Sequence, residues 1–347
     1  MQISSNLNDL KTHNLSKPGS YEWWYFDFID ENSDYSFVVI FFTSFLFSPR
    51  YIKKTESGNE FNINDYCAVN VCVYRENKIL DYFLIEYDRN DLKFTESENE
   101  YTVNIAQNSI NFVTTDNVIK VYLSCNLINP VNGKKIKIKC ELTPLITNDD
   151  KNTDFSGDEF SDKWYPAFPK CKISGKIYLD RSTKNQRSVK KILVEGTGYA
   201  DKNWSDKPIY KDIDDWSWGR CHLKEYTIIF FRIIYSHKVF NKFLIYKNDK
   251  LIVHKENFNI NSVKKRNYWR LEYPSEIQIT DSEVSLVIKN KNLIDNGPFY
   301  IRFNSEFDLK INSDSVSGNG FFEIIKPARL LNKFLHPFIN LRIKSKE

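Results

Sequence analysis

The chain contains 347 residues, and its 49 basic and 45 acidic side chains give a formal net charge of +4. A hydrophobic content of 41% is ample for one large domain or two ordinary ones. The charges are evenly mixed, without the basic blocks that follow a phosphate backbone, so we do not expect the chain to bind nucleic acid.

The N-terminal region is polar and contains no apolar signal segment. No stretch approaches the roughly 18–20 consecutive apolar residues that a membrane-spanning helix needs. The six cysteines form no CxxC pair and no cluster with histidine, which is typical of reduced cysteines in an intracellular protein. We therefore predict a cytoplasmic protein without a transmembrane segment and without a zinc site.

Short apolar runs, alternating or continuous, follow one another along most of the chain. Asn, Asp, Gly and Pro separate them at roughly 8–12-residue spacing, which is typical of an antiparallel β-barrel or sandwich. Glycine is scarce, so Asn and Asp are expected to form many turns, as in YRENK and YKNDK. The runs occupy residues 35–42, 66–74, 79–87, 101–106, 110–115, 119–128 and 134–145, then 172–180, 226–235, 242–260, 276–280, 282–290 and 299–311.

An acidic, weakly patterned stretch at residues 146–166 interrupts these runs. Asp150, Asn152 and Asp154 begin a calcium-loop spacing, but Phe155 and Ser161 stand where an EF-hand needs Gly and Glu. We therefore expect a solvated loop, one that covers the mouth of a pocket, rather than a calcium site.

Helical periodicity is convincing only near the C-terminus. Pro327 is placed to begin a helix, and Pro337 should kink or shorten it. Apolar residues at 330, 331, 334, 335, 338 and 339 give it one apolar face. We expect this basic, amphipathic helix to pack on its own β-barrel, and contact with a membrane surface is the alternative.

The stretch SYEWWYFDF, residues 20–28, places acidic side chains in an aromatic strand. Alternation directs Glu22 and Trp24 to one face, and Trp23, Tyr25 and Asp27 to the other. An ionised glutamate inside a protein must pair, bind a donor or take up a proton. The alternative is a surface glutamate at the start of the strand, with the tryptophans in the core.

A second unusual stretch is GTGYADKNWSDKP, residues 196–208. Its glycines permit a tight turn before Asp201, Lys202, Asn203 and Trp204, and its pattern is neither a dinucleotide-binding nor a Walker loop. These polar groups suit two roles equally well. They could contact one polar atom of a ligand in an apolar cavity, or they could join two barrels through buried hydrogen bonds.

Further along, WSWGRCHL sets Trp216, Trp218, Arg220 and His222 on one face of a strand. His222 fits a general base, and it equally fits a histidine that is hydrogen-bonded at a barrel rim. Arg232 has apolar neighbours on both sides in IIFFRIIY, so it is expected to pair with a buried carboxylate such as Glu22 or with an acidic group of a ligand.

Four motifs in order, spread over almost the whole chain, resemble the carotenoid 1,2-hydratase/hydroxyneurosporene synthase family. They are EWWYF, then GxGYxDxNWxxxP, then WxWG, and finally PFYIRF with GNGFFEIIKPARL. The superfamily also includes the fungal decalin-forming Diels–Alderases. Hydratases usually carry histidines around the motif aspartate, whereas Ala200 and Lys202 stand there in this chain. The motifs are therefore closer to the Diels–Alderase branch.

The resemblance implies an all-β fold of two lipocalin-like antiparallel β-barrels packed together, with a short C-terminal helix. The N-terminal barrel would comprise residues 1–205 and the C-terminal barrel residues 206–347, with an apolar pocket at their junction. In this fold a cofactor-independent cyclase of the Diels–Alderase type would fold a linear polyene or polyketide-derived chain into a reactive shape. Hydrogen-bond donors would polarise a conjugated carbonyl.

Two alternatives remain open. A hydratase or protonative cyclase would transfer a proton from Glu22 or Asp201, with a raised pKa, to a terpenoid or carotenoid double bond. A lipophilic-ligand carrier would perform no chemistry. No metal or cofactor is implied, and the expected partners are a hydrophobic polyene and, transiently, an upstream biosynthetic enzyme.

Motifs and resemblance together define the predicted site. The predicted catalytic residues are Glu22, Asp201, Asn203, Trp204 and Trp218. The predicted substrate-binding residues are Trp23, Trp24, Tyr25, Tyr199, Lys202, Trp216, Arg220, His222, Arg232, Tyr300 and Arg302, and a barrel-stabilising role is the alternative for the last two.

Overall fold

The computed structural model describes residues 2–116, 118–148, 161–181, 188–236, 238–256, 258–280 and 283–345. Asp150, Asn152 and Asp154 lie outside them. The two ends of the stretch at residues 146–166 are described, and Ile146 and residues 163–166 belong to strands rather than to the expected loop. The chain divides into two compact units, and each is described by itself. The first comprises residues 1–76, 80–208 and 337–347, and the second comprises residues 77–79 and 209–336.

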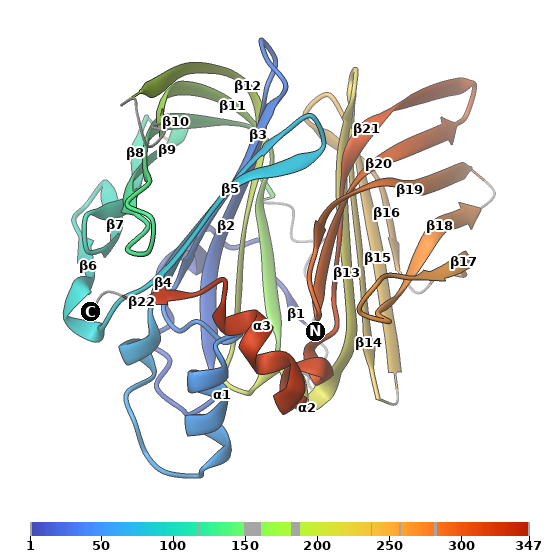
Figure 1. Ribbon diagram of the computed structural model, residues 1–347. Coiled ribbons are helices and arrows are strands. Elements are labelled where there is room, and N and C mark those ends of the chain that lie inside the picture. Colours follow the sequence, from blue (N-terminus) through green and yellow to red (C-terminus); the bar gives the residue numbers. More distant parts are fainter. Residues whose placement is uncertain are drawn as a thin grey trace. The chain divides into compact units, whose positions relative to one another are not determined.

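The first unit is built on a sheet of 13 strands, counted over the described residues, that curls into a half-barrel (Figure 1). Its order is β22-β5-β4-β3-β2-β12-β11-β10-β9-β8-β7-β6, and the two-residue strand β1 pairs with β11. The strands are β1 (Gln2–Ile3), β2 (Tyr21–Asp30), β3 (Tyr35–Phe42), β4 (Ala68–Arg75), β5 (Lys78–Glu86), β6 (Leu92–Glu96), β7 (Glu100–Ile105), β8 (Asn108–Thr115), β9 (Val118–Ile128), β10 (Lys135–Ile146), β11 (Lys163–Asp180), β12 (Val189–Ser205) and β22 (Lys344–Ser345).

The second unit contains a curled sheet of nine strands within the described residues, in the order β16-β15-β14-β13-β21-β20-β19-β18-β17. Its neighbouring strands pair antiparallel. The strands are β13 (Ile213–Leu223), β14 (Tyr226–Tyr235), β15 (Lys238–Lys247), β16 (Lys250–Glu256), β17 (Asn261–Arg266), β18 (Glu272–Thr280), β19 (Val284–Asn296), β20 (Tyr300–Ile311) and β21 (Asp314–Ile325). The predicted all-β class, with two lipocalin-like antiparallel sheets, is confirmed.

Asparagine forms several of the turns, as predicted from the scarcity of glycine. Asn77 (φ 60°), Asn248 (φ 57°) and Asn312 (φ 51°) adopt the left-handed conformation in the β4–β5, β15–β16 and β20–β21 connections. Asparagine tolerates this region better than most residues because its short polar side chain bonds locally.

Helices are short and lie between strands or at the ends of the chain. The α-helices are α1 (Pro49–Glu56), α2 (Ile209–Asp212) and α3 (His336–Asn340), and the 3₁₀ turns are η1 (Leu7–Leu10), η2 (Ile63–Tyr66), η3 (Arg89–Asp91), η5 (Pro327–Leu331) and η6 (Lys333–Leu335). None of the helices in the described residues has the length and hydropathy that a membrane crossing requires.

The predicted C-terminal helix is shorter than its periodicity indicated. The segment that begins at Pro327 forms two 3₁₀ turns and then α3, in which Pro337 occupies the first turn, where its missing N–H costs nothing. Leu330 and Ile339 are buried, but Phe334 is 87% exposed. The apolar face is thus packed only in part.

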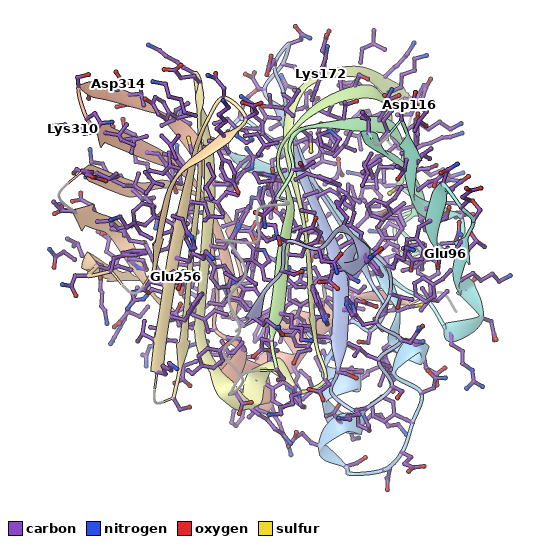
Figure 2. All side chains as sticks on the ribbon, turned by 180° about the vertical axis from the view of Figure 1, so that it is seen from behind. Glu96, Asp116, Lys172, Glu256, Lys310 and Asp314 are labelled. Carbon is purple, nitrogen blue, oxygen red and sulfur yellow. The ribbon has the colours of Figure 1, made fainter. Side chains whose placement is uncertain are left out.

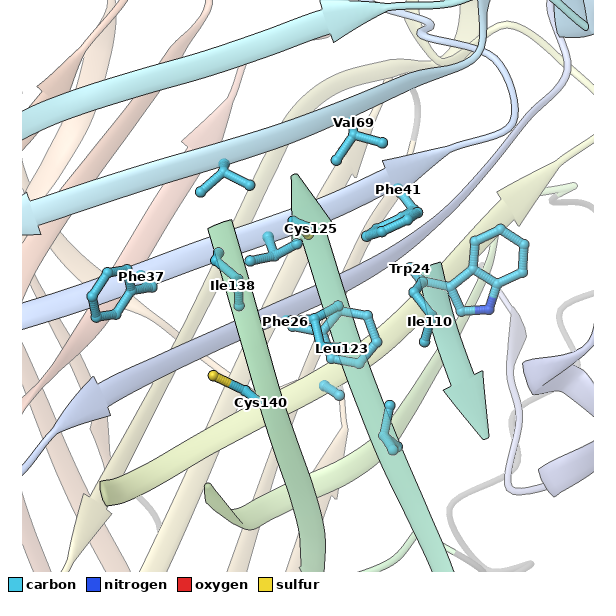
Figure 3. Close-up of a cluster of buried hydrophobic side chains, with 14 of the residues drawn as sticks. Trp24, Phe26, Phe37, Phe41, Val69, Ile110, Leu123, Cys125, Ile138 and Cys140 are labelled. Carbon is cyan, nitrogen blue, oxygen red and sulfur yellow. The ribbon is translucent and has the colours of Figure 1, made fainter. Parts of the chain in front are cut away.

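Each unit has its own apolar core on the concave side of its sheet. In the first, alternate residues of β2, β3, β9 and β10 converge, among them Phe26, Phe37, Leu123 and Ile138 (Figure 3). In the second, Phe230, Phe243, Phe307 and Phe322 belong to one cluster. All six cysteines are free and buried, and burial raises the pKa of Cys140 and Cys221 to about 12, so these thiols pack as small apolar residues.

Candidate functional site

The two unusual stretches of the first unit are neighbouring strands. Strand β12 pairs antiparallel with β2, and the register sets Asp201 opposite Tyr25, Lys202 opposite Trp24 and Trp204 opposite Glu22. The EWWYF and YADKNW motifs therefore form one two-stranded surface. Neither motif by itself indicated this pairing.

Strand alternation divides these residues between two faces. We call the side directed to the core the inner face, and it carries Glu22, Trp24, Lys202 and Trp204. The opposite side is the outer face, and the side chains that it carries are all buried as well: Trp23, Tyr25, Asp27, Tyr199, Asp201 and Asn203. The predicted catalytic residues Glu22 and Asp201 therefore point away from each other.

Asp201 is the centre of a hydrogen-bonded group on the outer face. Its Oδ2 accepts hydrogen bonds from Trp164 Nε1 at 3.0 Å and from the Tyr199 hydroxyl at 2.9 Å, and its Oδ1 accepts one from Asn203 Nδ2 at 2.9 Å. Asp201 as a whole is 7% exposed. Three donors around a buried carboxyl fix its orientation and offset the loss of water.

A second carboxyl group lies on the same face. Asp27 is fully buried, and the Tyr25 hydroxyl donates to its Oδ2 at 2.9 Å. Because Asp27 stands opposite Tyr199 and Asp201 opposite Tyr25, the two strands carry matching Tyr–Asp pairs, and the tyrosine rings lie edge to face at 6.2 Å. Alternation had placed Asp27 on this face, but the motifs gave no reason to include it in the site.

The inner face holds a buried ion pair. Lys202 Nζ lies 2.8 Å from Glu22 Oε1, and their side chains are 0% and 1% exposed. Residues that precede β2 complete the group: the His13 ring and backbone N–H contact Glu22 Oε1 at 2.9 Å, and the Thr12 hydroxyl donates to Oε2 at 2.8 Å. The prediction that Glu22 is buried and paired is therefore confirmed, and the alternative of a surface glutamate is wrong.

Aromatic rings surround this ion pair. The ammonium group of Lys202 lies 4.8 Å from the ring centroid of Trp24 and 5.3 Å from that of Trp204, both within cation–π range. The ring of His13 stacks on Trp204 at 4.2 Å. Trp204 Nε1 is buried and has no hydrogen-bond acceptor among the described residues.

Electrostatics keep Glu22 ionised. Burial raises the pKa of Glu22, but the Lys202 charge and hydrogen bonds from His13 and Lys202 outweigh burial and lower it to about 2. Burial lowers the pKa of Lys202 despite the attraction of Glu22. Burial also lowers the pKa of His13, yet hydrogen bonds to Asp9 and Glu22 outweigh it, so the net change is upward. Proton donation by Glu22 would require the opposite change.

These shifts predict how the stability of the fold depends on pH. An unfolded glutamate binds its proton near pH 4.5 and the folded Glu22 near pH 2, so stability should fall by about 3 kcal/mol as the pH drops through this window. His13 has a raised pKa, so its contribution is complete below pH 6.5 and is lost as the pH rises through its folded pKa. Urea unfolding midpoints between pH 2 and pH 8 measure both pH dependences.

Glu22→Gln should reduce the loss of stability between pH 4.5 and pH 2. The control Glu141→Gln, at a partly exposed pair, should leave that loss unchanged. An equal loss in Glu22→Gln and in the native chain would show that Glu22 is not its cause.

The predicted residues of the second unit lie mostly on one face of its sheet. Trp216, Trp218, Arg220 and His222 alternate with the core residues Cys221 and Leu223 along β13, which confirms their shared face. On the adjoining strands Arg302 forms an ion pair with Glu323 and lies 4.0 Å from the ring centroid of Phe321, and Arg220 lies 5.1 Å from the same ring.

Two further predicted residues of this unit have other positions. Arg232 stands opposite Ser217, on the side of the sheet that faces the core. Burial lowers the pKa of its guanidinium, and the charge of Asp215 offsets this only in part. Asp215 in turn is paired with Lys326. The expected pairing of Arg232 with Glu22 is wrong, because Glu22 forms its ion pair with Lys202. Tyr300, at the start of β20, stands opposite Ile325 and is half-buried.

Several residues of the site could not be identified from the sequence. Asp9, Thr12 and His13 lie in a polar segment without a motif, and Trp164 borders the acidic stretch before β11. Their recruitment depends on contacts between distant parts of the chain. Within the described residues, no group of three or more His, Cys, Asp or Glu side chains is arranged to hold a metal ion.

Comparisons of the sequence point to one family. The sequence model of the carotenoid hydratase CrtC family matches residues 39–347. A hydroxyneurosporene dehydrogenase of Chlorobaculum tepidum is 25% identical over 366 residues, which cover 99% of this chain and 92% of the relative. An acyclic carotenoid 1,2-hydratase of Thiocapsa roseopersicina is 22% identical over 221 residues, which cover 63% of this chain and 49% of the relative.

Solved structures share the fold. A crystal structure of CghA with Sch210972 gives a TM-score of 0.60 at 12% identity and covers 89% of both chains. A candidate AttH protein of Nitrosomonas europaea gives a TM-score of 0.60 at 15% identity and covers 93% of this chain and 97% of that one. At such identities the likeness concerns the fold alone.

Proposed function

Because this chain belongs to the carotenoid hydratase CrtC family, we propose that it adds water to an isolated carbon–carbon double bond of a long apolar isoprenoid chain of the acyclic carotenoid type. Family membership makes it an enzyme with a hydratase- or cyclase-type role. The observation that carries the finer proposal is the buried carboxyl group of Asp201, held by three side chains on an aromatic face.

Hydration of an unactivated double bond needs a proton donor and then a water molecule. In the proposed reaction the protonated Asp201 carboxyl gives its proton to the less substituted alkene carbon, and the π electrons form the new C–H bond. The other carbon becomes a tertiary cation, and a water oxygen binds to it. The surplus proton of that water returns to the Asp201 carboxylate, so the acid is regenerated and the net change is addition of one water.

The partners of Asp201 are compatible with this cycle. Trp164 Nε1–H can only donate, and Asn203 donates from Nδ2 in the observed orientation, so both favour the carboxylate that remains after proton transfer. The Tyr199 hydroxyl can donate to the carboxylate or accept from the acid. Tyr199 can thus adapt to both protonation states by rotating its hydroxyl, and Asn203 can do so only by flipping its amide.

The remaining outer-face side chains suit a positively charged intermediate. Trp23 and Tyr25 lie on the face that carries Asp201, and Tyr21 stacks on Trp23 at 5.1 Å. Aromatic faces attract cations through their quadrupole, and more strongly where water is excluded. Glu22 does not compete for the acid role, since its lowered pKa and its ion pair with Lys202 keep it ionised.

Incubation of the purified chain with an acyclic carotenoid in ¹⁸O-labelled water tests the proposal. A hydratase is expected to yield a product that has gained one labelled water, detected by mass spectrometry together with the loss of one double bond from the chain. A product of unchanged mass would contradict hydration and indicate cyclisation. Substrate that is recovered unchanged from a bound complex would contradict both and indicate a carrier.

Intramolecular cyclisation of a linear polyene, the leading prediction from the sequence, is the second candidate. The buried Trp204 Nε1–H favours it, since a donor without an acceptor among the described residues could polarise a carbonyl of a bound polyene. The amide donor of Asn203, predicted for the same role, is engaged by Asp201. The two candidate functions thus use opposite faces of the β2–β12 pair.

A further inference from the structure

The second unit exposes basic and apolar side chains along β17 and at the tip of the hairpin between β17 and β18. Tyr268 is 88% exposed and Val263 is 57% exposed. Between and beside them stand the exposed basic residues Lys264, Lys265, Arg266 and Arg270. Solvent-facing apolar side chains among cations are not explained by packing within the unit.

A segment close to the C-terminus extends this surface. Arg329 of η5 donates from Nη2 to the backbone oxygen of Trp269 at 2.8 Å and from Nε to that of Pro298 at 2.6 Å. These bonds attach the segment to the hairpin tip. In this C-terminal segment Leu331 is 45% exposed and Phe334 is 87% exposed. We call residues 263–270 and 329–334 together the docking face.

The docking face carries positive charge without compensating acids of its own. Residues 263–270 contain four basic residues and residues 329–334 contain two, and neither range contains Asp or Glu. Glu272, which follows the tip, lies 2.8 Å from Lys264 and 3.5 Å from Arg266. Lys265 and Arg270 have no ion-pair partner among the described residues, so their charges are available to a partner.

We propose that the docking face binds the surface of an anionic lipid bilayer. The basic side chains are attracted to the headgroups, and the exposed rings of Tyr268 and Phe334 enter the headgroup region, where amphipathic and aromatic side chains are favoured. A nucleic acid would engage the same charges, but it would leave Val263, Leu331 and Phe334 without a role. The inference goes beyond the proposed reaction and does not depend on it.

Vesicle co-sedimentation of the full chain tests the proposal. Binding is expected to vesicles of phosphatidylcholine with about one third phosphatidylserine, to be much weaker to pure phosphatidylcholine, and to decrease at high salt. Each basic residue near such a surface contributes about a fivefold change in affinity, so Lys265→Gln with Arg270→Asn should weaken binding about 25-fold. Asparagine suits position 270 because Arg270 has a left-handed φ of 58°.

Two further variants separate charge from insertion and from general effects. Tyr268→Ser with Phe334→Ser should weaken vesicle binding while the thermal midpoint stays unchanged, since both side chains are almost fully exposed. The matched control is Lys250→Gln with Lys310→Gln, which removes two charges at the other end of the sheet. Lys310 lies there beside Asp314 (Figure 2). Lys310 pairs across β20 and β19 with Ser285, which in turn pairs with Thr280 of β18, and Thr280 is about 27 Å from Glu272 along that strand.

Three outcomes would overturn the proposal. The first is that the native chain does not sediment with anionic vesicles. The second is an equal loss of binding in the control variant and in Lys265→Gln/Arg270→Asn, which would mean that net charge alone is responsible. The third is tight binding of a single-stranded oligonucleotide that the docking-face variants abolish, without binding to vesicles, which would identify a nucleic-acid surface.

Discussion

Asp201→Asn should lower the rate of product formation by about 10²–10⁴-fold, the usual contribution of a general acid. The variant is expected to fold, because the asparagine oxygen can still accept from Trp164 and Tyr199. The new amide group would face Asn203 Nδ2, but Asn203 has a buried Oδ1 without a hydrogen-bond partner among the described residues. A flip of the Asn203 amide would present that oxygen as the acceptor.

Initial rates with saturating carotenoid, together with the thermal midpoint, measure this effect. Glu195→Gln is the matched control, since it removes an exposed carboxylate from the same strand and should change neither quantity. Asp27→Asn tests the second carboxyl of the outer face. If Asp27→Asn abolished turnover while Asp201→Asn retained it, the acid role would belong to Asp27, and the assignment to Asp201 would be wrong.

Lys202→Met should destabilise the fold by about 3–5 kcal/mol, the usual cost when one partner of a buried ion pair is removed. Methionine fills a similar volume, so the loss arises from Glu22, which would keep a buried charge without the ammonium group. Guanidinium unfolding at pH 7 measures the free energy directly. Adding Glu22→Gln to Lys202→Met should recover most of it, because the uncompensated charge is then gone.

The partly exposed pair Lys120–Glu141 provides a control of similar geometry. Its N–O distance is 2.7 Å, close to that of Glu22–Lys202, but its side chains are 44% and 33% exposed. Lys120→Met should therefore leave the unfolding midpoint unchanged, since water screens the charge that remains. Equal effects of Lys120→Met and Lys202→Met would show that burial does not determine the strength of the inner-face pair.

The two substitutions also separate structure from chemistry. Lys202 and Asp201 are adjacent in sequence, yet alternation places them on opposite faces of β12. We expect Lys202→Met to act mainly on stability and Asp201→Asn mainly on turnover. A single DKNW motif thus contains one residue that stabilises the first unit and one that is proposed to perform the reaction.

Local patterns of the sequence determined the fold class and the family. Alternation at period 2 is a property of each strand by itself, so the runs predicted an all-β chain, and the faces of β2 and β13 were predicted correctly. The turn residue at Asn77 and Asn248 could likewise be predicted, since the φ preference is intrinsic to asparagine. The four ordered motifs identified the family that the match to residues 39–347 confirms.

Only the tertiary structure decided which residues meet. Whether Glu22 is a proton donor or an ion-pair partner depends on Lys202 and His13, which reach it through the β2–β12 register and through the segment before β2. Trp164 joins Asp201 because β11 is the other neighbour of β12. Such contacts between distant residues follow from how strands pair, and periodicity carries no information about pairing. The sequence by itself therefore determined which side chains are unusual, and the tertiary structure decided what each of them does.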